Sequence, residues 1–95
     1  MSMKEAYRKK KEAELKELEA RIDLLKAEMA KADAEQRVRY EEQVEMLQKK
    51  QHQVRNRIEE LRTSTENAWE EVKSGVELAW DDLKTALERA EQKFK

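Results

Sequence analysis

The chain has 95 residues, of which 21 are basic and 22 acidic, so a formal net charge of −1 accompanies a charged fraction of 45%. This length allows one small domain with a thin core. Because the chain contains no cysteine, disulfides, thiol catalysis and thiolate metal sites are excluded. No apolar run approaches the length of a signal-peptide core or a membrane span, so we expect a soluble, cytoplasmic protein.

The composition predicts an almost entirely helical chain. Proline is absent, glycine occurs once, and Ala, Glu, Lys, Leu, Arg and Gln dominate. Opposite charges also recur four residues apart in the favourable order, as in Glu5 with Lys9 and Glu17 with Arg21. We therefore interpret the charged residues as solvated helix faces and predict an all-α fold.

The first two thirds of the chain carry a heptad pattern. Apolar residues separated by three and four positions run from Leu15 to Met29, and a second series runs from Tyr40 to Leu61. Each series predicts one apolar stripe that packs against another helix. The polar Gln51 interrupts the second stripe. It is either tolerated at the edge of a helix pair or a determinant of register and oligomer number.

The stretch between the two stripes allows two interpretations. Eleven residues separate Met29 from Tyr40, which keeps the stripes in phase along one continuous helix. Asp33 and Gln36 have the spacing of a capping box, which predicts a helix break within residues 31–35 instead. Because the neighbouring alanines have high helix propensity, we favour the continuous helix.

A turn is predicted at residues 63–67. Three consecutive hydroxyl residues begin at Thr63 and compete with the helix for backbone hydrogen bonds. Thr63 and Glu66 also have capping-box spacing. The last helix is then expected to span residues 68–95.

The last helix contains an eleven-residue phrase written twice, AWEEVKSGVEL followed by AWDDLKTALER. Eleven residues make three helical turns of about 3.67 residues each, so Trp69 and Trp80 lie along one stripe. Alanines beside this stripe widen the apolar face. A wide apolar face is typical of a helix that touches two neighbouring helices or a membrane.

Two all-α architectures fit these elements. In the first, a long heptad helix at residues 1–62 joins a shorter helix that folds back on its second half, giving a coiled-coil-like hairpin that self-associates to cover its first stripe. In the second, a break near Asp33 gives a three-helix bundle. We favour the first. The residues expected at helix interfaces are Leu15, Leu18, Ile22, Leu25, Met29, Tyr40, Val44, Leu47, Val54, Ile58, Leu61, Trp69, Val72, Val76, Trp80, Leu83 and Leu87.

Alanines also recur every seven residues on the side of the first helix opposite its apolar stripe. They are Ala6, Ala13, Ala20, Ala27 and Ala34. Alanine has the highest helix propensity, so this spacing is typical of a solvated helix face. The less favoured alternative is a second, close-packed interface in an oligomer.

Catalytic and metal-binding constellations are absent from the sequence. The only imidazole is His52, whereas zinc and iron sites need three or four convergent ligands. A nucleophilic hydrolase would need a base for Ser2, Ser64 or Ser74. Gly75 stands alone in a helix, so there is no glycine-rich phosphate loop. We therefore predict no enzyme activity, no cofactor and no metal.

Two features raise the question of nucleic acid or membrane partners. The basic run from Arg8 to Lys11 is flanked by acidic residues and no sustained basic stripe follows, so we interpret it as a solvated helix start and predict no nucleic-acid binding. Residues 66–95 carry eight acidic and five basic side chains, a balance that opposes anionic lipid. A membrane surface is therefore less favoured than tryptophans packed between helices.

The tryptophan repeat resembles the C-terminal segment of a group of small, uncharacterised bacterial coiled-coil proteins. That group has the form AWEDLKxGVExAWDELxxAL, which AWEEVKSGVELAWDDLKTAL matches, and VRYEEQVEMLQ resembles one of its mid-chain phrases. The resemblance implies a helical fold and supplies no activity, substrate or cofactor. A designed helical protein would show similarly regular charges.

We therefore expect a non-enzymatic structural or scaffolding coiled-coil protein that acts through helix–helix self-association, as a homo-oligomer or with a helical protein partner. The alternative is peripheral binding to lipid or another apolar surface through the C-terminal tryptophan helix. The two functions differ in whether the tryptophans are buried or available to a ligand.

Overall fold

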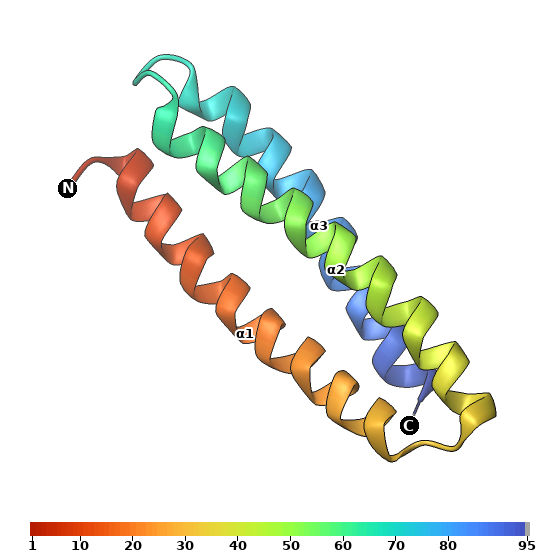
Figure 1. Ribbon diagram of the computed structural model, residues 1–95. Coiled ribbons are helices and arrows are strands. Elements are labelled where there is room, and N and C mark those ends of the chain that lie inside the picture. The colour runs from red at the N-terminus through yellow and green to blue at the C-terminus, as the bar shows by residue number, and fades with distance from the viewer. Residues whose placement is uncertain (95) are drawn as a thin grey trace.

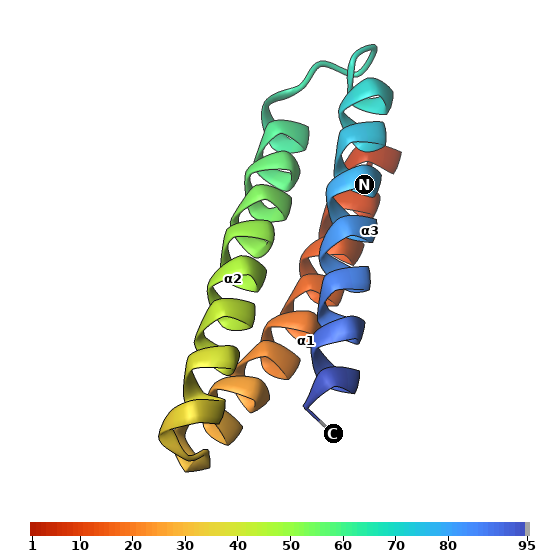
Figure 2. The same cartoon turned by 90° about the vertical axis from the view of Figure 1, so that its right-hand side faces the viewer.

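The computed structural model describes residues 1–94, and it is a bundle of three helices, α1 (Met3–Lys31), α2 (Ala34–Thr63) and α3 (Trp69–Lys93). The predicted all-α class is confirmed. Successive helices run in opposite directions, so α1 and α3 are parallel to each other and antiparallel to α2 (Figure 1). Turned by 90°, the bundle shows α1 behind α2 and α3 and extending across both (Figure 2). The rod measures 51 × 19 × 18 Å.

The predicted continuous helix of residues 1–62 does not form. Instead, α1 ends at Lys31, just before Ala32. Asp33 caps α2, and its carboxylate accepts a hydrogen bond from the backbone N–H of Gln36 at 2.9 Å. The structure therefore has the three-helix alternative. Helix propensity differs by only tenths of a kcal/mol per residue among ordinary residues, whereas each buried leucine contributes about 1.5 to 3 kcal/mol. Burial of the α1 stripe outweighs the local preference to continue.

The second turn begins one residue later than predicted. Thr63 is the last residue of α2, and its hydroxyl donates to the carbonyl of Glu60 at 3.2 Å, so the predicted capping box with Glu66 does not form. The hydroxyl of Thr65 instead accepts from the N–H of Ala68 at 3.2 Å. Residue 95, which we assigned to the last helix, lies outside the described residues.

One apolar core runs the length of the bundle. It contains the stripes of all three helices together with Ala86 and Ala90 of α3. At one end the ring of Tyr40 stacks on Phe94, with 3.9 Å between the ring centroids. Every interface residue predicted from the sequence is buried in this core, except that Met29 and Val72 are partly buried against it.

Candidate association surfaces

The first apolar stripe has its partners within the same chain. Leu15, Leu18, Ile22 and Leu25 are buried against α2 and α3. Our reason for expecting a partner chain was that this stripe would stay uncovered in a hairpin. In the three-helix bundle that reason no longer holds, so association between closed copies must use other surfaces.

The α1 stripe continues beyond the leucines as a cationic segment. Lys4, Arg8 and Lys11 precede Leu15 on the same stripe, with the same spacing of three and four residues. Lys11 is only 7% exposed, so the basic run is not entirely a solvated helix start as we predicted. The ammonium of Lys4 donates to the carbonyl of Ser64 at 2.7 Å, which attaches the start of α1 to the second turn.

Lys11 is accommodated by an aromatic and acidic environment. Its Nζ lies 4.4 Å from the centroid of the Trp80 ring and 3.5 Å from carboxylate oxygens of both Glu14 and Glu77. A cation over an indole face is attracted by the ring quadrupole, and this attraction strengthens as water is excluded. These contacts offset part of the loss of hydration that Lys11 suffers on burial.

Tyr7 forms the second part of this cluster. Its ring is tilted against Trp69 with 6.3 Å between centroids, and the Nζ of Lys73 lies 5.1 Å from the Tyr7 centroid. The Tyr7 hydroxyl donates to the carboxylate of Glu77. Burial, followed by this hydrogen bond, raises the pKa of Tyr7. The same hydrogen bond lowers the pKa of Glu77, with help from the ammonium groups of Lys11 and Lys73.

The two tryptophans of the repeat therefore serve as core residues facing the N-terminal part of α1. Trp69 contacts Tyr7 and Trp80 covers Lys11, and each tryptophan is 7% exposed. In this conformation neither indole is available to a lipid surface. Within residues 1–94, no helix has both the length and the apolar character needed to cross a bilayer.

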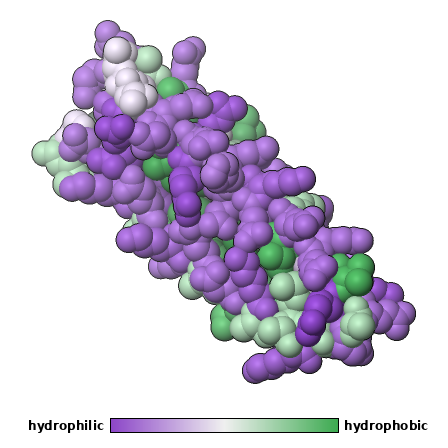
Figure 3. Space-filling model, in the orientation of Figure 1, coloured by the Kyte–Doolittle hydropathy of each residue, from purple (hydrophilic) through white to green (hydrophobic). Residues whose placement is uncertain are grey.

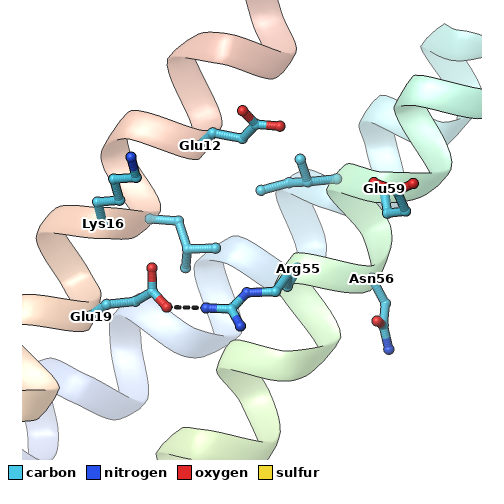
Figure 4. Close-up of a pocket in the computed structure, with 8 residues that line it drawn as sticks. Glu12, Lys16, Glu19, Arg55, Asn56 and Glu59 are labelled. Carbon is cyan, nitrogen blue, oxygen red and sulfur yellow. Dashed lines mark hydrogen bonds and ion pairs between the residues drawn. The ribbon is translucent and has the colours of Figure 1, made fainter.

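A groove of about 500 Å³ runs between α1 and α2 (Figure 4). Its apolar floor is formed by Leu15 and Ile58. On the rim, the carboxylate of Glu19 accepts hydrogen bonds from Arg55 and Gln51. Gln51 thus links α2 to α1 at the polar position of its stripe. Within the groove Glu19 pairs with Arg55, whereas Glu12 and Glu59 pair with Arg8 and Arg62, which do not line it.

The absence of a metal site and of catalysis is a prediction from the sequence. The structure shows where the candidate side chains lie. His52 is exposed on α2. Across the described residues, no group of three or more histidine, aspartate or glutamate side chains converges closely enough to hold a metal ion.

The side of α1 that points away from α2 and α3 remains exposed. Ala6, Ala13, Ala20 and Ala27 all lie on it, whereas Ala34, the fifth member of the predicted series, is the first residue of α2. Leu24 is 64% exposed on the same face. The surface seen in Figure 3 is mostly hydrophilic, with separate hydrophobic spots. The α1 face is the part of α1 that could contact another helix without disturbing the core.

Fold and surfaces together define a small all-α three-helix bundle. Comparison with known proteins finds no family model, no curated protein and no solved structure that matches the chain. The resemblance of the tryptophan repeat to bacterial coiled-coil proteins stays a prediction.

Proposed function

We propose that the protein is a non-enzymatic structural element that acts through helix–helix self-association, with the outward face of α1 as the interface. The supporting observation is the exposure of Leu24 beside Ala20 and Ala27 on this face. Apolar side chains on a helix face that has no neighbour in its own chain lose contact with water when a second helix covers them. The alanines allow that helix to approach closely.

The charges on this face favour an antiparallel pair of copies. Lys16 and Asp23 are exposed, and because they are seven residues apart they lie on the same flank of α1, with Ala20 between them at the centre of the face. In an antiparallel helix pair, equal flanks face each other. When Ala20 packs against its counterpart, Lys16 of each copy faces Asp23 of the other copy, which gives two symmetric ion pairs.

Sedimentation equilibrium over a wide range of protein concentration tests the proposal. We expect the wild-type chain to pass from monomer to dimer and Leu24→Glu to remain monomeric, since a carboxylate would be buried in the interface. Leu78→Glu is the matched control, because Leu78 is 74% exposed on α3. A wild-type chain that stays monomeric, or equal effects of the two variants, would refute the proposal.

Charge reversal tests the orientation of the pair. Lys16→Asp alone and Asp23→Lys alone each place like charges opposite one another and are expected to weaken the dimer. The double variant Lys16→Asp with Asp23→Lys restores both ion pairs and is expected to recover it. A double variant weaker than both single variants would exclude the antiparallel arrangement.

A further inference from the structure

The turn between α1 and α2 is made of two residues, Ala32 and Asp33, both in extended backbone conformations with negative φ. Its hydrogen bonds are local. The N–H of Ala32 donates to the carbonyl of Met29 at 3.1 Å, and the Asp33 carboxylate caps Gln36. Alanine and aspartate are both free to adopt helical as well as extended backbone, so neither residue restricts this segment to the turn. The turn has only two residues and alanines flank it, so when it opens the local helix propensity favours joining α1 to α2, which moves α1 away from its own bundle.

The other contacts of α1 are made to the surfaces of α2 and α3, and Lys4 also donates to the carbonyl of Ser64 in the second turn. The leucine stripe is buried against both helices, Lys11 lies over Trp80, and Arg21 Nε donates to a carboxylate oxygen of Glu91 at 3.0 Å. A second copy of the chain offers the same surfaces in the same arrangement. Once α1 leaves its own bundle, the complementary partner is therefore the α2 and α3 pair of another copy.

We infer that two copies exchange their α1 helices about Ala32 and Asp33 and form a dimer in which α1 of each copy completes the core of the other. Apart from the hinge, every contact in the exchanged dimer already exists within the single chain. The exchange is thus a second route to self-association, distinct from the packing of closed bundles through the outward face of α1. It is opposed by the entropy of association, so it increases with protein concentration.

Crosslinking tests the exchange directly, because the chain has no native cysteine. Arg21→Cys and Glu91→Cys are made as separate chains, one of them isotope-labelled, then mixed, incubated at high concentration and treated with a short bismaleimide. Only α1 exchange places the two thiols side by side, since in closed monomers they belong to different molecules. We expect a crosslinked species with one chain of each kind, in a yield that rises with concentration.

Two controls make the result decisive. The double variant Arg21→Cys with Glu91→Cys crosslinks within one chain and shows that the reagent spans the distance. Arg21→Cys mixed with Leu78→Cys measures random collisions, because Leu78 is exposed on α3. A yield for the Arg21→Cys and Glu91→Cys mixture no higher than this background would overturn the exchange.

The hinge provides an independent test. Asp33→Ala removes the cap of α2 and adds a strong helix former at the turn, so it is expected to raise the yield of exchanged dimer about fivefold, as the loss of one N-cap implies. The control is Asp81→Ala, an exposed aspartate on α3. Equal yields for the two variants would contradict the role of the hinge.

The outward face is tested separately by Ala20→Cys, which crosslinks to itself only if closed or exchanged copies pack through that face. Crosslinking of Ala20→Cys without the mixed species would uphold the proposed function and overturn the exchange. The mixed species without Ala20→Cys crosslinking would do the reverse.

Discussion

The ammonium of Lys11 lies 4.4 Å from the centroid of the Trp80 ring, at a stripe position that leucine occupies seven and fourteen residues later in α1. The α1 stripe thus has a cationic first third and an apolar remainder. The repeat in α3 places Trp80 over Lys11 and Trp69 against the neighbouring Tyr7. Polar and aromatic contacts therefore join α1 to α3 here, where the leucine stripe has ended.

Replacement of the buried charge by a hydrocarbon is expected to stabilise the fold. Lys11→Leu should raise the free energy of unfolding in urea by about 1 kcal/mol, because burying an ammonium costs more than its contacts return and leucine continues the stripe. Lys10→Leu, at the neighbouring exposed lysine, should change it by less than about 0.5 kcal/mol. A clear loss of stability in Lys11→Leu would show that the cation–π contact is a net stabiliser.

The tryptophans should behave as core residues in solution. Their emission is expected to be blue-shifted, resistant to acrylamide and unchanged by neutral or anionic vesicles, since both indoles are shielded from water. Trp80→Ala should lower the free energy of unfolding by about 3 to 5 kcal/mol. Emission that shifts to the blue on adding vesicles would instead favour the lipid-binding alternative.

Two leucines of α3 should differ sharply in their contribution to stability. Leu83 is completely buried, so Leu83→Ala should lower the free energy of unfolding by about 2 to 5 kcal/mol. Leu78 lies on the surface of the same helix, and Leu78→Ala should change it by less than about 0.5 kcal/mol. Similar urea midpoints for the two variants would be inconsistent with the orientation of α3.

The single glycine should tolerate a methyl group. A Cβ on Gly75 would lie 3.7 Å from Cδ of Arg57, an ordinary van der Waals contact, and the backbone there is helical. Gly75→Ala should therefore raise the free energy of unfolding by about 0.5 to 1 kcal/mol, because alanine restricts the unfolded chain. Ser74→Ala serves as a neighbouring control. Destabilisation by Gly75→Ala would indicate a tighter contact between α2 and α3.

Acid should weaken the contact between α1 and α3 through Glu77. Its pKa in the folded chain lies below the ordinary 4.5, chiefly because the Tyr7 hydroxyl donates to the carboxylate. The stability that Glu77 contributes is therefore complete above pH 4.5 and is lost as pH falls through the lower folded-state pKa. The difference in unfolding free energy between wild type and Glu77→Gln should shrink over that range.

Tyr7→Phe provides the matched variant for this pH dependence. It removes the hydroxyl and keeps the ring against Trp69, so the acid-dependent difference attributable to Glu77 should become smaller. A pH profile of Tyr7→Phe that coincides with that of the wild type would show that this hydrogen bond does not set the pKa of Glu77.

The sequence by itself determined the helical class, the second turn to within one residue and the buried side of every helix. Apolar spacing of three and four residues depends only on local helix geometry, so the positions of Leu15 or Val54 on an apolar stripe follow without knowledge of the neighbours. For the same reason the stripe shared by Trp69 and Trp80 could be placed from their eleven-residue separation.

Only the tertiary structure decided how many helices the first 62 residues form and what the tryptophans face. The break at Asp33 is opposed by the helix propensity of the alanines and favoured by burial of the α1 stripe against α2 and α3. This balance depends on contacts between residues far apart in the chain. The burial of Lys11 was also missed, although its heptad position marks it. A charged residue on a stripe becomes a core residue only when a partner such as Trp80 covers it.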